Sequence, residues 1–352
     1  MIPVNEPLLD GNEKKDLVEC IETGWTSSEG SFVKKFEEQF ASSVDRQYGI
    51  SVCNGTAALD IAVAALDIGP GDEVILPSFT IISCASAIVR TGARPVVVDS
   101  DPYTWNMNVT QIEEKITKRT RAIMAVHIFG LPVDMDPILK LADRYGLKII
   151  EDAAEMIGQT YKGRACGSFG DISTFSFYAN KHITTGEGGM IVTDDKELAE
   201  KCRSLRNLCF GKGKKRFVHE QLGWNFRMTN LQAAVGLAQL EKLEEHVARK
   251  RQMGKLYTEL LKDVPGLQLP LAATDYAENI YWVYGLVLKD EVNFDAFEAM
   301  KMLSEYNIGT RPFFWPMHEQ PVFKNMGLFE NEKLPVAEKL ARRGFYLPGG
   351  LA

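Results

Sequence analysis

Residues 73–98 read EVILPSFTIISCASAIVRTGARPVVV, and this stretch decides the fold class. Two short apolar runs, Glu73–Leu76 and Pro95–Val98, enclose a segment of helix length, Ser83–Thr91. Two strands joined by a crossover helix of this length are typical of a parallel βαβ unit. The stretch therefore predicts a parallel sheet whose faces are covered by helices.

The same alternation continues on both sides of this unit. Further apolar runs occur at 122–126, 148–150, 172–177 and 189–192, and segments of helix length at 55–65, 109–115, 137–145 and 196–206. This pattern predicts a large α/β domain with a mainly parallel sheet flanked by helices. In such sheets, ligands bind in the loops beyond the carboxyl ends of the strands.

The chain changes character after a long helical pattern at 230–262, in which Gly254 is expected to mark a bend or the join of two helices. Beyond Val264-Pro265-Gly266, residues 281–288 predict a strand and residues 293–306 a helix. With 352 residues and about 150 residues per domain, two domains are expected. We predict a large domain at 1–254, which includes the N-terminal segment and the long helix, and a smaller α/β domain at 255–352.

The composition excludes several classes of protein. The 40 basic and 47 acidic residues give a net charge of −7, which argues against nucleic acid or an anionic membrane as the partner. No apolar run reaches the length of about 18 residues that a membrane span needs. The six cysteines form no CxxC pair, so we expect reduced thiols, a cytoplasmic location and no bound metal.

The residues with the clearest chemical potential lie within 151–190, EDAAEMIGQTYKGRACGSFGDISTFSFYANKHITTGEGGM. Asp152 follows an apolar strand, and Lys181 lies in a polar, glycine-rich loop. A partly buried lysine can form a Schiff base with an aldehyde cofactor, and a carboxylate can keep a pyridine ring protonated. The pair could therefore hold pyridoxal phosphate (PLP), although the residues alone fit a surface lysine and a capping aspartate better.

A second stretch, Cys53-Asn54-Gly55-Thr56-Ala57-Ala58-Leu59, places a Gly-Thr turn at the start of a predicted helix. Free backbone N–H groups there can bind a phosphate. An ordinary helix cap explains the same residues, because Asn and Thr are good caps. The stretch is no P-loop, and no strand-linked GxGxxG motif supports a nicotinamide dehydrogenase.

Taken in order, the motifs of this chain resemble those of the nucleotide-sugar aminotransferases, a branch of the fold type I PLP enzymes, and within that branch those of the perosamine synthases. The resemblance covers almost the whole chain. It is carried by GWTSSEG (24–30), NGTAAL (54–59), GDEV (71–74), PSFT (77–80), VH (126–127), EDAAE (151–155), GDISTFSF (170–177), TGEGG (185–189), NFRMT (225–229) and Arg311-Pro312.

The resemblance implies a seven-stranded sheet, a homodimer with shared active sites, and roles for named residues. Lys181 would be the Schiff-base lysine and the acid/base, Asp152 the partner of the pyridine nitrogen, and Glu155 a neighbour of the phenolic oxygen. The phosphate would be held by Gly55, Thr56, Ser176 and, from the neighbouring subunit, Asn225. Ile81 stands where relatives often have an aromatic residue that stacks on the ring, so Ile81 itself or Phe79 would replace that contact. Relatives also usually extend by about one more helix beyond the point that corresponds to the last residue of this sequence.

The implied reaction moves an amino group from L-glutamate, through pyridoxamine phosphate, to C4 of a nucleotide-linked 4-keto-6-deoxyhexose. Perosamine-like residues favour a GDP sugar, while UDP- or dTDP-linked sugars and a 3-amino product remain open. The resemblance places His219 and His318 near the sugar nucleotide. The basic run 211–216 fits a solvated loop better, although its cationic side chains could also lie near the nucleotide diphosphate, and Arg311 is a candidate for the same role. His127 is expected to be structural, and His182 to orient substrate or to stabilise its loop.

Two other classes use the same fold. A related dehydratase has histidine in place of the Schiff-base lysine, so Lys181 argues against it. A non-catalytic scaffold is expected to lose Lys181 or Asp152, and both are present.

Overall fold

A seven-stranded sheet forms the centre of the protein in the computed structural model, which describes residues 1–210, 215 and 217–352. The strand order is β1-β9-β8-β5-β4-β2-β3, and β9 alone runs opposite to the other six strands of this sheet. The mainly parallel sheet expected from the sequence is thereby confirmed. The strands are β1 (Tyr48–Val52), β2 (Glu73–Pro77), β3 (Arg94–Val98), β4 (Thr120–Val126), β5 (Lys148–Asp152), β8 (Ile172–Ser176) and β9 (Gly189–Thr193).

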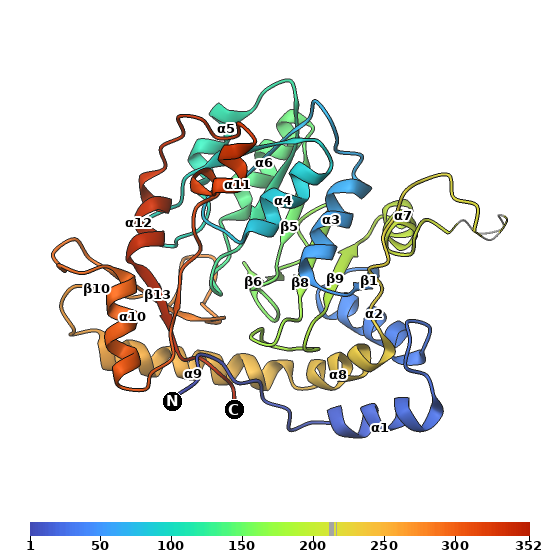
Figure 1. Cartoon of the computed structure of the whole chain (residues 1–352), viewed down its shortest axis with the longest axis horizontal. Coiled ribbons are helices and arrows are strands. Elements are labelled where there is room, and N and C mark those ends of the chain that lie inside the picture. The colour runs from blue at the N-terminus through green and yellow to red at the C-terminus, as the bar shows by residue number, and fades with distance from the viewer. Residues whose placement is uncertain (211–214, 216) are drawn as a thin grey trace.

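Helices cover both faces of this sheet, because its strands are apolar on both sides (Figure 1). In β4, Ala122, Met124 and Val126 belong to one apolar cluster, whereas Ile123 and Ala125 belong to another. This alternation is the period of two expected for a strand buried on both faces. The first cluster includes α3 (Gly55–Ala65), α4 (Ile82–Arg90) and α7 (Lys196–Arg206), and the second α2 (Ser31–Ser43), α6 (Met135–Tyr145) and α8 (Asn230–Leu240).

A second, antiparallel sheet lies on the C-terminal side, with strand order β10-β11-β13-β12. Its strands are β10 (Leu267–Gln268), β11 (Tyr284–Leu288), β12 (Arg311–Pro312) and β13 (Gly344–Leu347), and α10 (Ala296–Glu305) and α12 (Pro335–Arg343) pack against it. Shorter elements are α5 (Ile112–Lys115), the β6–β7 hairpin (Thr160–Tyr161 and Arg164–Ala165) and α11 (Pro321–Asn325). Helix α1 (Glu13–Thr23) packs on α8.

The long helical pattern at 230–262 forms two helices, but the prediction of a bend or a join at Gly254 is wrong. The break follows α8, which ends at Leu240, and α9 then runs without interruption over Leu243–Leu261 (Figure 1). Gly254 is buried inside α9, where a Cβ atom would come within 2.3 Å of the Tyr281 ring. The glycine therefore allows close packing and does not bend the helix. The proposed domain boundary at 254/255 remains a prediction, and it falls within α9.

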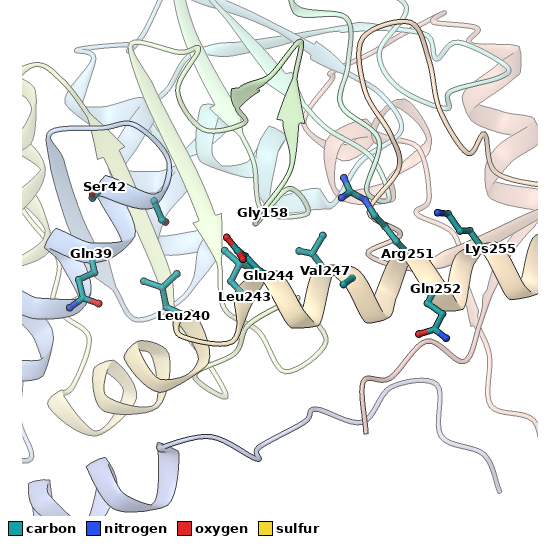
Figure 2. Close-up of a pocket in the computed structure, with 12 residues that line it drawn as sticks. Gln39, Ser42, Gly158, Leu240, Leu243, Glu244, Val247, Arg251, Gln252 and Lys255 are labelled. Atoms are coloured by element: carbon teal, nitrogen blue, oxygen red, sulfur yellow. The ribbon is translucent and has the colours of Figure 1, made fainter.

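A hollow of about 990 Å³ lies between α2, the loop at Gly158 and α9 (Figure 2). Ser42, Val247 and Arg251 are among its lining residues, and none of the site residues predicted from the sequence lines it. All six cysteines are unpaired. In the part of the chain that the structure describes, no helix combines the length and the apolar character needed to cross a bilayer.

Candidate active site

A separate cavity of about 450 Å³ opens at the carboxyl ends of β4, β5 and β8. This is the edge of the sheet at which ligands are expected. The sequence-predicted residues of this chain that line the cavity are Gly55, Thr56, Ile81, Asp152, Glu155, Ser176 and Lys181. The structure thus brings together residues that are up to 126 positions apart in the sequence, from Gly55 to Lys181.

Asp152 is the last residue of β5, and its carboxylate is almost fully buried at the cavity. Oδ1 accepts a hydrogen bond from the Ala154 backbone N–H at 3.1 Å, and Oδ2 accepts one from the Cys84 thiol at 3.2 Å. Burial raises the pKa of Asp152, and the nearby Lys181 opposes that rise. A buried carboxylate of this kind is stable as an anion when a cationic group faces it. The position fits a partner for a protonated ring nitrogen.

Lys181 follows β8 in a tight turn, because its backbone N–H donates to the Tyr178 carbonyl at 2.9 Å. Its Nζ lies 3.8 Å from Glu155 Oε1 and 3.6 Å from the centroid of the Trp282 ring. Burial lowers the pKa of Lys181, whereas the Glu155 carboxylate opposes this. A lysine with a lowered pKa is available as a neutral amine nearer to physiological pH, which suits a nucleophile or a general base.

Glu155 completes the polar group around the lysine. Its Oε2 accepts a hydrogen bond from the Phe129 backbone N–H at 2.6 Å. Burial raises the pKa of Glu155 to about 8, against the opposing effect of Lys181. Burial thus disfavours the charged forms of both Glu155 and Lys181, and the charge of each partly offsets this for the other.

The other end of the cavity is formed by the N-terminus of α3. The Asn54 side chain accepts a hydrogen bond from the Ala57 N–H at 2.8 Å. The N–H groups of Gly55 and Thr56 have no acceptor within the helix, because they lie at its start. The hydroxyls of Thr56 and Ser83 lie 2.8 Å apart beside them. Such a cluster of donors at a helix start suits a phosphate.

Two details of the cavity fit PLP. A Cβ atom on Gly55 would come within 2.8 Å of the Ser176 Cβ, so the cradle at the start of α3 exists only with glycine at this position. Thr174 Oγ1, which lines the cavity, is buried without a hydrogen-bond partner. The donors at one end and the carboxylate at the other match an anion and a protonated ring, respectively.

The predicted substrate residues do not all lie in this cavity. Arg311 is exposed and lines a small adjoining cavity of about 120 Å³ together with Asn180, Trp282 and Tyr346, which also line the main one. His219 is exposed, and its Nδ1 donates to the Leu208 carbonyl at 2.7 Å. Asn225 is also exposed, outside the lining of its own chain's cavity. Most of the basic run, 211–214 and 216, lies outside the described residues.

The structure places His318 outside the lining of this cavity, whereas the resemblance implies a position near the substrate. The side chain is buried, and its Nδ1 is hydrogen-bonded to Ser78 Oγ at 2.7 Å while its Nε2 lies 3.1 Å from Glu338 Oε1. With both ring nitrogens engaged away from the cavity lining, His318 fixes the start of the loop after β2 to the C-terminal region.

His127 and His182 are held by hydrogen bonds within the protein. His127 lines the cavity, and its Nδ1 accepts from the Val133 N–H at 3.1 Å while its Nε2 lies 3.1 Å from Glu151 Oε1. His182 Nε2 donates to the Ile280 carbonyl at 3.1 Å, and burial lowers the pKa of His182 to about 3. His182 therefore stabilises its loop as a neutral ring.

Sequence reasoning missed several residues of the cavity. Ser83 lines the cavity from the first turn of α4, and the next residue, Cys84, donates to Asp152; their position directly after β2 is the sequence signal for both. Trp282, Phe314 and Tyr346 come from the C-terminal region, and no local pattern connects them with Lys181. Of the two candidates for the ring contact, Ile81 lines the cavity, whereas Phe79 is buried against Phe129 and Phe313.

Comparison with known proteins identifies the family of this chain. The profile of the DegT/DnrJ/EryC1/StrS aminotransferase family matches residues 7–351. The GDP-perosamine synthase of Escherichia coli O157:H7 is 43% identical over 350 residues, which cover 99% of this chain and 93% of that protein.

Solved structures resemble the whole fold. The aminotransferase TlmJ from Streptoalloteichus hindustanus superposes with a TM-score of 0.90 at 32% identity, over 99% of this chain and 93% of that one. DesV of S. venezuelae, solved in complex with a ketimine intermediate, has a TM-score of 0.87 at 34% identity, over 96% of this chain and 88% of that one. The chain therefore belongs to the DegT/DnrJ/EryC1/StrS aminotransferase family and is a PLP-dependent aminotransferase.

Proposed function

We propose that this enzyme transfers an amino group from L-glutamate to C4 of a GDP-linked 4-keto-6-deoxyhexose in the cytoplasm. The observation that carries the proposal is the buried cavity in which Lys181 and Asp152 lie together, with phosphate-binding donors at one end. The similarity to the E. coli GDP-perosamine synthase favours the GDP sugar over UDP- and dTDP-linked sugars, and favours C4 over C3.

Each residue has a defined task in this reaction. PLP supplies an electron sink that lets a proton leave the carbon bearing the amino group. Asp152 stays ionised and holds the ring nitrogen in its protonated form. Lys181 would be the acid/base that moves the proton between the substrate carbon and the cofactor, in opposite directions in the two half-reactions. Because both halves use one cavity in alternation, the kinetics are ping-pong.

The substrate assignment is tested with three sugar nucleotides. Purified enzyme is offered L-glutamate with GDP-, UDP- or dTDP-linked 4-keto-6-deoxyhexose, and 2-oxoglutarate is measured. We expect the highest kcat/KM with the GDP sugar, and NMR of the product should place the amine at C4. A preference for a UDP or dTDP sugar, or an amine at C3, would replace this substrate while leaving the aminotransferase class intact.

We further propose a homodimer in which Asn225 and His219 serve the partner's site. Both residues are exposed and lie between α7 and α8, outside their own cavity. Co-expression of a Lys181→Ala chain with an Asn225→Ala chain tests this. A hybrid dimer with shared sites has one intact site, so activity should return to about a quarter of wild type through random pairing of equal amounts. Activity no higher than that of the separate variants would contradict sharing.

Gly55→Ala is expected to weaken cofactor binding. The added Cβ would lie 2.8 Å from the Ser176 Cβ and 3.2 Å from its Oγ, so Ser176 would have to move away from the phosphate position. Overpacking of this kind costs about 1–3 kcal/mol, which corresponds to a rise in the Kd for PLP of about 5- to 150-fold. Titration of the protein with PLP measures the Kd. In the control Gly69→Ala, the nearest atom is 3.7 Å away, and the Kd should not change.

Glu155→Gln is expected to shift the pH profile of proton transfer. Where Glu155 is ionised, which begins near its pKa of about 8, its carboxylate stabilises the Lys181 ammonium, so its removal lowers the pKa of Lys181. The neutral amine is then available at lower pH, and the rate should begin to rise about one pH unit earlier. Single-turnover reaction of the pyridoxamine phosphate form with the keto sugar, followed from pH 6 to 9, measures this. An unchanged profile would mean that Glu155 does not act on the lysine.

A further inference from the structure

The indole ring of Trp282 lies directly under the reactive amine. Lys181 Nζ sits over the ring, 3.6 Å from its centroid, which is closer than its 3.8 Å distance to the nearest carboxylate oxygen, of Glu155. A cation held over an aromatic face is attracted by the negative potential of that face, and tryptophan is the strongest such partner. Trp282 precedes β11, more than 100 residues after Lys181 in the sequence.

The ring is fixed in this position from several sides. Its Nε1 donates to the carbonyl of Asn180, the residue before Lys181, at 2.9 Å. Its backbone carbonyl accepts from the buried amine of Lys250 at 3.1 Å, and the same amine also donates to the Gly349 carbonyl. The ring packs beside those of Phe129 and Tyr346, and the residue is only 5% exposed. The indole is therefore a rigid platform for the lysine.

The groups that act electrostatically on Lys181 are few. Glu155, Asp152 and Cys84 favour its charged form, while burial disfavours it. The two carboxylates have other partners, because Glu155 binds the Phe129 N–H and Asp152 binds the Ala154 N–H and the Cys84 thiol. The face of the Trp282 ring differs from these groups. It attracts a cation without gaining or losing a proton, and no other hydrogen bond competes for it.

We propose that Trp282 is a positioning residue whose indole face holds the free Lys181 amine between its two tasks. In the proposed reaction the amino donor would displace the lysine in the first half-reaction, and the lysine would rejoin the cofactor only at the end of the second, so its amine is free while it moves the proton in both halves. A rest position over the ring keeps the amine within reach of the reacting carbon and out of water. This proposal rests on the aminotransferase reaction and is independent of which sugar is the substrate.

The test varies the negative electrostatic potential of the Trp282 ring face. Fluorinated tryptophans at position 282 keep the shape and the N–H group but progressively weaken the negative potential of the face. In protein freed of PLP, the rate at which Lys181 reacts with an amine-specific reagent, mapped by mass spectrometry across pH, gives the pKa of that lysine. Each added fluorine should lower this pKa, by about half a unit to one unit over the series. An unchanged pKa would overturn the proposal.

Two substitutions separate the ring face from packing. Trp282→Phe keeps an aromatic face and loses the N–H, whereas Trp282→Met keeps an apolar side chain and loses the face. We expect Trp282→Phe to retain the pKa of Lys181 within about 0.3 units and kcat within threefold. Trp282→Met should lower the pKa and reduce kcat about tenfold or more, with little change in KM. Equal effects of the two substitutions would assign Trp282 a packing role only.

A matched control is available in Trp315, which is half exposed and lies over Arg342 with its ring centroid 5.0 Å from the guanidinium. Trp315 does not line the cavity. Trp315→Met removes a tryptophan–cation contact elsewhere and should leave both the pKa of Lys181 and kcat unchanged. A drop in kcat in this control would show that the loss of a tryptophan lowers kcat by destabilising the protein, and not by removing a ring face from Lys181.

Discussion

Lys181→Ala is expected to abolish transamination, with kcat reduced at least about 10⁴-fold, because the variant lacks both the covalent attachment point and the group that moves the proton. The structure gives no substitute, since no other lysine lines the cavity among the residues described. The visible absorbance band of the lysine-bound cofactor should also disappear. Release of 2-oxoglutarate and an absorbance scan measure the two effects.

The control for this variant is Lys255→Ala. Lys255 lines the separate hollow shown in Figure 2, which contains none of the predicted site residues. This variant should keep its activity and its absorbance band. If Lys181→Ala retained both properties, the assignment of the 450 Å³ cavity as the active site would be wrong.

Asp152→Asn is expected to reduce kcat about 10²- to 10³-fold, the range typical for removing one preorganised electrostatic partner. The amide cannot balance the charge of a protonated ring nitrogen, so the ring becomes a weaker electron sink. Asn is close in size to Asp, and the contacts with Ala154 and Cys84 can be kept in part. The variant should therefore fold and still bind PLP.

Single-turnover kinetics with L-glutamate measure this effect at the proton-transfer step. Asp143→Asn, at an exposed position of α6, provides the matched control and should behave as wild type. A rate for Asp152→Asn within about threefold of wild type would mean that another group faces the ring nitrogen.

The sequence predicts the central sheet well because its signals are local. Runs such as 73–76 and 95–98 are short and apolar, and each is followed by a segment long enough for a crossover helix. Strand and crossover can therefore be identified without tertiary information. The position of Asp152 follows from the same pattern, since it ends a buried strand. The error at Gly254 has the opposite cause. Only the packing of Tyr281 against α9 explains that glycine, and this contact cannot be predicted from a helix pattern.

The C-terminal contribution to the site could not be predicted for the same reason. Trp282, Phe314 and Tyr346 reach the cavity because they pack in, or against, the apolar cluster that also contains residues of the first sheet, across more than 100 residues of sequence. His318 illustrates the converse. Its placement at the substrate site relied on a resemblance, whereas in this chain Ser78 and Glu338 engage both ring nitrogens.

The most direct test of the account is to reduce the PLP-loaded enzyme with borohydride and to map the modified peptide by mass spectrometry. Reduction fixes the cofactor to the amine that carries it. The account predicts a single adduct on Lys181, within the peptide that follows β8. An adduct on a different lysine, or no adduct in protein supplied with excess PLP, would contradict it.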